Sequence, residues 1–168
     1  ALPIYCQTPP IAKLDASLNS CVECERLALS TNCIDRMIAL PGMAKLKILS
    51  MGRNNIKKIE HVEGNSATLE ELWLSYNQIS SLDGISGCTN LTTLYLSNNN
   101  IKHWAELDKI ADMPNLRDVL LIGNPIYDEF TKELARVEVI KHLPNLVKLD
   151  GDMVKPSERE MALGVVPE

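Results

Sequence analysis

The sequence predicts an α/β solenoid: a parallel sheet on the concave face, short helices on the convex face and a helical cap at the C-terminal end. Two observations lead to this fold class. An eleven-residue template recurs at a near-constant interval, and apolar residues at helical spacing follow its copies. A single coil cannot bury its own apolar face, so the copies must stack into one domain spanning 1–168.

The template reads L-x-x-L-x-L-x-x-N-x-I. Copies start at residues 24, 46, 69, 91 and 116, at intervals of 22, 23, 22 and 25, and a partial copy, LVKLDG, begins at 146. The fourth and sixth places alternate on a short strand and therefore share its buried face. The ninth place falls where the chain turns, and a buried Asn there can offer two donors and an acceptor to neighbouring coils. These residues are Asn32, Asn54, Asn77, Asn99 and Asn124.

The repeats divide the chain into an irregular first coil (about 11–23), five full repeats (24–126), a helical insertion (127–145) and a last strand with its cap (146–168). Only ten residues precede the first coil, without an initiating Met, so whether an N-terminal capping segment is missing stays open.

The C-terminal elements are predicted from periodicity and capping signals. Apolar residues at helical spacing should cover the last coils; they are Phe130, Leu134, Val137, Ile140 and Leu143. We expect Pro156, Ser157 and Glu160 to form a capping box for a short final helix that ends near Gly164. Arg136 and Lys141 are predicted to lie on a solvated helix face, and Trp104 to fill the convex core.

Composition narrows the function classes. The net charge is −5 and the pI is near 5.3, which disfavours nucleic acid as a ligand because phosphate binding needs excess Lys and Arg. No apolar run approaches the roughly 20 residues of a membrane span, and ALPIYCQTPP does not resemble a signal peptide. We therefore expect a cytosolic protein without membrane contact, whose five cysteines are reduced.

No constellation for catalysis, cofactor binding or metal binding is predicted. Cys21 and Cys24 have C-x-x-C spacing, but there is no second pair and Cys24 occupies a Leu place, so a core role is favoured. His61, His103 and His142 fall at non-equivalent places of different coils.

The open sheet face carries the candidate binding site. Places three, five and seven of each copy point away from the core, which puts Trp73, Tyr95 and Leu120 side by side. Glu70 and Asp118 add to a charged rim. An alternative stays open, in which a ring packs under a neighbouring loop or only stabilises the sheet by cross-strand pairing. The predicted partner-binding residues are Ile48, Arg53, Glu71, Trp73, Tyr76, Tyr95, Arg117, Leu120 and Ile122.

Longer segments carry a resemblance to a known family. The interval near 22 resembles the short class of leucine-rich repeats, and LPNLVKLDGDMV followed by SERE resembles the cap of such solenoids. LEELWLSYNQI, LYLSNNNIKHW, LLIGNPIY and RVEVIKHLPNLVKLDG together resemble the leucine-rich-repeat light chains of axonemal outer-arm dynein. The resemblance extends from about Ile11 to Arg159.

The resemblance implies a non-catalytic subunit of the axonemal outer dynein arm in a cilium or flagellum. Such a subunit binds the microtubule-binding domain of a dynein heavy chain at the stalk tip and tunes motility by regulating how the motor engages microtubules. It needs no cofactor, and we expect a monomer outside the complex. The alternative is a general leucine-rich-repeat adaptor, such as a phosphatase regulator or a partner of an RNA-binding domain.

The resemblance also implies that basic residues of the cap, Lys155 and Arg159, lie near the microtubule. The other interpretation makes Arg159 an ordinary residue in the first turn of a helix. Residues 152–168 hold four acidic side chains and two basic ones, a net charge of −2, which argues against strong attraction to an acidic microtubule.

Overall fold

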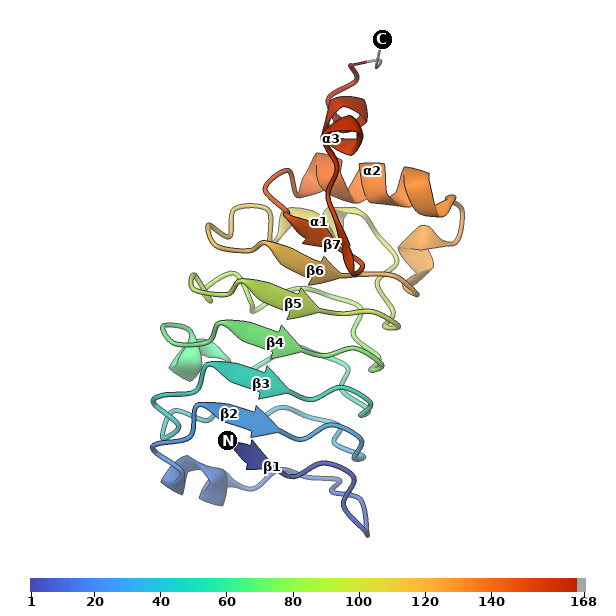
Figure 1. Ribbon diagram of the computed structural model, residues 1–168. Coiled ribbons are helices and arrows are strands. Elements are labelled where there is room, and N and C mark those ends of the chain that lie inside the picture. The colour runs from blue at the N-terminus through green and yellow to red at the C-terminus, as the bar shows by residue number, and fades with distance from the viewer. Residues whose placement is uncertain (166–168) are drawn as a thin grey trace.

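The computed structural model describes residues 1–165, which form a stack of coils from the N-terminus to the helices α2 and α3 (Figure 1). One eight-stranded sheet runs along the stack in the order β1 to β8, so each strand pairs with the next in sequence. Pairing is parallel from β1 to β7, and β8 is antiparallel to β7. The strands are β1 (Leu2–Pro3), β2 (Arg26–Ala28), β3 (Ile48–Ser50), β4 (Glu71–Trp73), β5 (Thr93–Tyr95), β6 (Asp118–Leu120), β7 (Lys148–Leu149) and β8 (Asp152–Met153). The predicted solenoid is confirmed.

Helices are short and lie in the segments that connect the strands, except α3, which follows the last strand. None of the helices in the described part of the chain has the length and apolar character needed to cross a bilayer. The 3₁₀ helices are η1 (Ala16–Ser20), η2 (Glu63–Asn65) and η3 (Pro125–Tyr127), and the α-helices are α1 (Ala105–Asp108), α2 (Lys132–His142) and α3 (Pro156–Ala162).

The core is a single column of aliphatic side chains between the sheet and the return segments. Residues at the fourth place of each copy are buried, as the strand alternation predicts, and the sixth place is buried in the same way. The fourth-place residues are Leu27, Leu49, Leu72, Leu94, Val119 and Leu149. Because each layer packs against the next, no coil has an apolar face of its own to expose within the stack.

Buried asparagines join successive coils. Asn99 donates from Nδ2 to the carbonyls of Leu74 (2.9 Å) and Leu96 (3.0 Å), and its Oδ1 accepts from the backbone N–H of Ile79 (2.9 Å). At the last coil an aspartate at the fifth place joins the coils differently, since Asp150 Oδ1 accepts from the N–H of Leu121 at 2.7 Å. The predicted pairing of each Asn with the backbone of the neighbouring coil is confirmed.

The turn after each strand uses a left-handed residue at the eighth place of the template. The φ angles there are 58° at Thr31, 53° at Arg53, 60° at Tyr76, 56° at Asn98 and 83° at Gly123. A Cβ at Gly123 would lie 2.4 Å from Asn98 Oδ1, so this turn requires glycine. The exposed Arg53 and Tyr76 side chains therefore stand at the end of their strands, beside the sheet face.

The sheet begins earlier than we expected. β1 precedes the first predicted coil, and it pairs with β2 through Leu2 opposite Leu27 and Pro3 opposite Ala28. The N–H of Ile4 then donates to the carbonyl of Ala28 at 2.7 Å. The template did not reveal this strand because LPIYC lacks the leucine spacing of the other copies.

Arg136 contradicts its prediction, because it is buried in the cap with only 5% of its surface exposed. Its Nε donates to Glu158 Oε1 of α3 at 2.5 Å, and its Nη1 donates to the carbonyl of Leu149 at 2.6 Å. The side chain therefore ties α2 to both α3 and β7. Lys141 is exposed and pairs with Glu138 at 2.8 Å, as expected for a solvated helix face.

Two further details of the cap differ from the prediction. The residue that precedes α3 is Lys155, whose N–H donates to Glu158 Oε2 at 2.8 Å, so the box of Pro156, Ser157 and Glu160 was wrong. The helix does end before Gly164, which has a φ of 75°. Leu134 is 58% exposed and does not cover the coils as predicted. Phe130 is 37% exposed but packs edge-on against Trp104, with centroids 5.3 Å apart, and the buried residues of the set are Val137, Ile140 and Leu143.

Candidate protein-docking surface

Register places the predicted aromatic residues next to each other. Trp73 of β4 lies opposite Tyr95 of β5, which lies opposite Leu120 of β6. The rings of Trp73 and Tyr95 are stacked, with centroids 5.8 Å apart and planes inclined by 26°. We call these three residues, with Ile48 and Ile122, the concave patch. Ile122 is exposed and the other four are half-buried.

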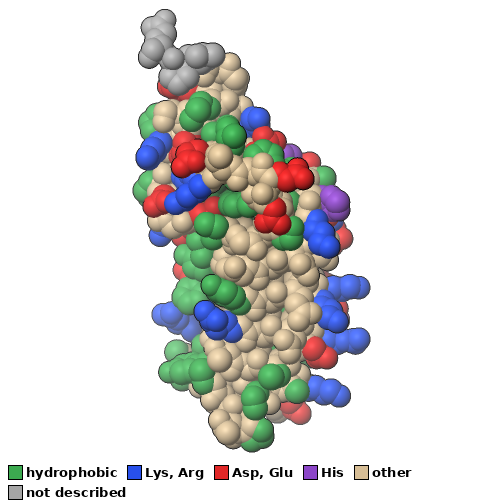
Figure 2. Space-filling view, turned by 90° about the vertical axis from the view of Figure 1, so that its right-hand side faces the viewer, with side chains coloured by type: hydrophobic (Ala, Val, Ile, Leu, Met, Phe, Trp, Pro, Cys, Tyr) green, Lys and Arg blue, Asp and Glu red, His purple; other side chains and the backbone are tan. Residues whose placement is uncertain are grey.

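Figure 2 views the edge at which the strands end, with the sheet face in profile at the left. Hydrophobic side chains gather along that left margin, whereas Lys and Arg side chains project from the right margin. Basic side chains also stand among the apolar ones at the left margin, so the sheet side is apolar with basic residues beside it.

Carboxylates hold the two rings in place. Trp73 Nε1 donates to Glu71 Oε2 at 3.0 Å, and the Tyr95 hydroxyl donates to Asp118 Oδ2 at 3.0 Å. Burial, followed by the neighbouring Asp118 and Glu71 carboxylates, raises the pKa of Tyr95 to about 12. The ring pair contributes cross-strand packing to the sheet, and it also leaves part of its apolar surface uncovered.

The predicted rim residues surround this pair. The Arg53 guanidinium lies over the Tyr76 ring, 4.2 Å from its centroid, and both side chains are exposed. Arg117 donates from Nη1 to the carbonyl of Leu116 at 2.8 Å. Asp118, which was assigned only to the rim, lies nearer the centre than expected, because it accepts from Tyr95. The sequence did contain a signal for this contact, because Asp118 occupies the third place of the copy next to that of Tyr95 and so points to the same sheet face.

The two basic residues predicted to lie near the microtubule belong to a different part of the molecule. Lys155 is exposed at the start of α3. Arg159 is half-buried, and its guanidinium donates to the carbonyl of Pro144 and, at 2.5 Å, to that of Leu146. The structure thus groups the other nine candidates on β3 to β6 and their turns, and leaves these two on α3.

Comparison with known proteins identifies the family. A family model described as the NXF1/2/3/5 leucine-rich repeat domain matches residues 59–151. Dynein axonemal light chain 1 of Chlamydomonas reinhardtii is 58% identical over 158 residues, which cover 92% of this chain and 80% of that protein. The chain belongs to the dynein axonemal light chain 1 family. The Danio rerio member is 58% identical over 95% of this chain and 84% of its own length, and the human member 54% identical over 94% and 83%.

Solved structures support the fold of this family member. A chain in the crystal structure of the Drosophila melanogaster SNF/U2A′ complex is 21% identical, with a TM-score of 0.74 and coverage of 92% of both chains. An internalin from Listeria monocytogenes is 18% identical, with a TM-score of 0.61, and matches 92% of this chain and 50% of its own. At these identities the likeness concerns the leucine-rich-repeat fold alone.

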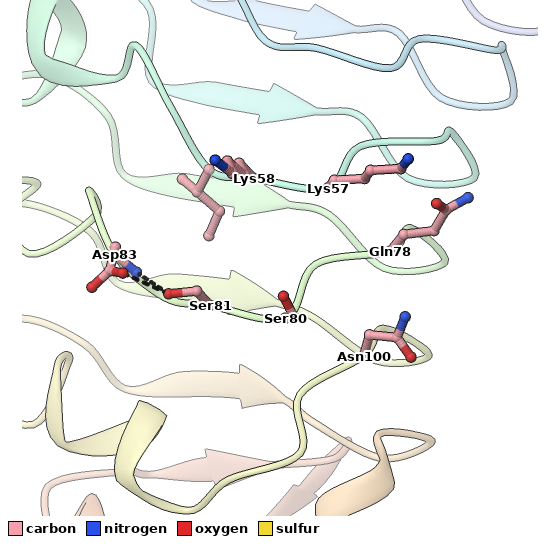
Figure 3. A pocket seen from close by; sticks show the side chains of 8 residues that line it. Lys57, Lys58, Gln78, Ser80, Ser81, Asp83 and Asn100 are labelled. Carbon is pink, nitrogen blue, oxygen red and sulfur yellow. Dashed lines mark hydrogen bonds between the residues drawn. The ribbon is translucent and has the colours of Figure 1, made fainter.

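Members of the dynein axonemal light chain 1 family are protein-interaction subunits and not enzymes, which agrees with our prediction for this chain. Within residues 1–165 no three His, Cys, Asp or Glu side chains come together as metal ligands would. Figure 3 shows a shallow pocket lined by Lys57, Lys58, Gln78 and Asn100, with Ser81 at one side beside Asp83, to which its hydroxyl donates at 2.8 Å. No His or Cys lines this pocket.

Proposed function

We propose that this light chain binds the microtubule-binding domain at the stalk tip of an outer-arm dynein heavy chain and regulates how that motor engages axonemal microtubules. The concave patch is the docking surface, and the result is a change in ciliary or flagellar motility. The observation that carries the proposal is the stacked, half-buried Trp73–Tyr95 pair on an open sheet face. The family name supplies the axonemal dynein context.

The energetic reason is the apolar surface that a partner can cover. Trp and Tyr dominate binding hot spots because each buries a large area with few rotatable bonds. At about 25 cal/mol per Å², covering a further 100 Å² or so of the two rings contributes roughly 2.5 kcal/mol. Leu120 and the exposed Ile122 extend the same surface on β6 and its turn.

The arrangement of the cap suggests how the microtubule is approached. Arg159 is half-buried and donates to a backbone carbonyl of the chain itself, whereas Lys155 is exposed. Lys155 is therefore the more accessible of the two predicted cations. The nearby Asp152 pairs with Lys132 at 3.3 Å. We propose that α3 lies near the microtubule with at most weak direct contact. The complex needs no cofactor, nucleic acid or membrane, and outside it the light chain is a monomer.

The test is calorimetric titration of an isolated heavy-chain stalk tip with the wild type and with the double variant Trp73→Ala plus Tyr95→Ala. Truncating both aromatic anchors should weaken binding by at least about 2 kcal/mol, roughly 30-fold. A matched control is Val22→Ala plus Leu134→Ala, which removes exposed apolar side chains elsewhere and should leave the affinity unchanged. Circular dichroism establishes that every variant is folded.

Each result leads to a definite conclusion. Equal binding by the wild type and the aromatic double variant would move the interface away from the concave patch, to α3 or the convex side. If the wild type itself does not bind any stalk tip, the general-adaptor alternative, a phosphatase regulator or partner of an RNA-binding domain, replaces the dynein proposal.

A further inference from the structure

We propose that the concave patch receives an arginine side chain of its partner, held between the carboxylates of Glu71 and Asp118 and against the Trp73 and Tyr95 rings. This inference deepens the proposed function and rests on it for the identity of the partner. It specifies the chemistry that the partner must present, which is one guanidinium surrounded by apolar residues.

Strand register builds the acidic side of this site. Glu71 lies opposite Thr93, and Thr93 lies opposite Asp118, so the two acidic residues flank β5 on its outer face. Neighbouring strands are about 4.8 Å apart. A cation above Thr93 would therefore lie roughly 5 Å from each carboxylate, within the range of a strong pairwise attraction at a partly desolvated surface.

The charges of the two carboxylates are only partly compensated. Among the described residues, no Lys, Arg or His comes within ion-pair distance of Glu71, and Asp118 has Lys148 Nζ at 3.9 Å, the limit of such a contact. The Tyr95 hydroxyl lies 3.0 Å from Asp118 Oδ2, and burial, followed by the Asp118 and Glu71 carboxylates, raises its pKa. A cation arriving from a partner would be attracted to this point.

Hydrogen-bonding capacity also remains. In the part of the chain that the structure describes, Asp118 Oδ1 is buried without a partner, and Oδ2 accepts from Tyr95. Glu71 Oε2 accepts from the Trp73 indole. Each carboxylate oxygen has two lone pairs, so Glu71 Oε2 and Asp118 Oδ2 can each accept a further donor, whereas the buried Oδ1 contributes charge and not a direct contact.

The aromatic pair selects guanidinium over ammonium. Arginine is planar, stacks on aromatic faces, is weakly hydrated and carries five donors in a rigid fork, whereas lysine is a compact and strongly hydrated charge. The same pairing already exists beside the patch, where the Arg53 guanidinium lies 4.2 Å from the Tyr76 ring centroid. Apolar groups next to the arginine would cover Leu120 and Ile48.

The experiment compares the wild type with Glu71→Gln plus Asp118→Asn in titrations against the same stalk tip at low and high salt. Amide oxygens can still accept from the Trp73 indole and the Tyr95 hydroxyl, so the rings should stay in place. We expect the double variant to bind at least about tenfold more weakly at low salt and to show a reduced dependence on salt. The matched control, Glu129→Gln plus Asp112→Asn, removes two exposed charges outside the site and should change affinity less than about twofold.

The outcomes separate this inference from the proposed function. If the wild type binds the stalk tip and the Glu71 and Asp118 double variant binds equally well, the arginine site is overturned and the proposed function stands. If the wild type does not bind, the proposed function fails, and the site is decided by the NMR signal of the Trp73 indole N–H. A shift with N-acetyl-arginine amide and none with the neutral N-acetyl-citrulline amide supports the site, whereas equal shifts overturn it.

Discussion

Asparagine at the ninth place shows how one side chain can define a fold. Its amide supplies two donors to carbonyls of two coils and one acceptor to an N–H of the preceding coil, and all of these groups are buried. Aspartate lacks the donors, so it could not replace these asparagines; Asp150, at the fifth place of the partial copy, only accepts, from two N–H groups. The residue type follows from the hydrogen bonds that the turn must satisfy.

Replacing Asn99 by Ala should therefore be costly. The change leaves the Ile79 N–H buried without a partner and removes one donor from each of the Leu74 and Leu96 carbonyls, which keep those of Asn77 and Asn124. We expect a loss of about 2 kcal/mol in the free energy of unfolding. Urea denaturation measures it. The adjacent Asn100 is exposed, and Asn100→Ala should stay within about 0.5 kcal/mol of the wild type. Similar losses for the two variants would contradict the assigned role.

Residue-scale prediction worked where a position repeats. In the five full copies the fourth and sixth places are buried, and so are the ninth-place asparagines apart from the half-buried Asn77, because each copy repeats the same environment. Arg136 has no counterpart in the other copies, and its partners Leu149 and Glu158 lie 13 and 22 residues away along the chain. Its burial arises from the tertiary contact of α2 with α3, and neither charge nor spacing in the sequence indicates that contact.

At the scale of elements, the cap depends on the ion pair between α2 and α3. The Arg136 and Glu158 side chains are 6% and 12% exposed. Hydrogen bonding from Arg136, outweighing burial, lowers the pKa of the Glu158 carboxyl below its ordinary value of 4.5. The stability from this pair is therefore present above about pH 4.5 and is lost as the pH falls through the depressed pKa.

Glu158→Gln tests this coupling. At pH 7 the variant leaves Arg136 buried without a counter-charge, so the free energy of unfolding should fall by about 3 kcal/mol. The gap between wild type and variant should narrow as the pH falls below 4.5, because the wild-type carboxyl then becomes neutral as well. Chemical denaturation at several pH values measures both effects, and a gap that does not depend on pH would rule out the ionic contribution.

Element boundaries were predicted least well at the two ends. β1 was missed because two residues of strand carry no periodic signal, and the box that starts α3 was assigned to Pro156, Ser157 and Glu160 although Lys155 and Glu158 form it. Along the middle of the chain each strand is too short to be predicted alone, but five copies of one template made its position clear. The concave patch could be foreseen for the same reason, whereas the stacking of its rings required the register.

The whole molecule is a one-dimensional stack in which each strand pairs only with its neighbours in sequence. Local stability should therefore vary along the stack, with central coils supported from both sides and edge strands from one. β4 and β5 are central, and β1 forms one edge of the sheet. The architecture thus predicts a gradient of protection rather than one uniform value.

Hydrogen exchange of the native protein measures this gradient. The N–H groups of Leu74 and Leu96, bonded to Tyr95 and Leu120, should exchange slowly, and that of Ile4 in the β1 edge should exchange fast. Leu94→Ala opens a cavity in the central layer, costs about 3 kcal/mol and should lower the protection of β4 to β6 most. The exposed Ser86→Ala is the control, and an equal loss at every amide would indicate all-or-none unfolding.

The short strands determine the dimensions of the sheet face. Strands β2 to β6 are three residues each, so the sheet face is narrow across the strands and long along the stack. Its repeat of about 4.8 Å is close to the 4.5 Å that three residues of an α-helix span. A helix lying along the stack would meet Trp73, Tyr95 and Leu120 with side chains three or four positions apart. The spacing of the strands along the solenoid thus matches the spacing of side chains along one face of an α-helix.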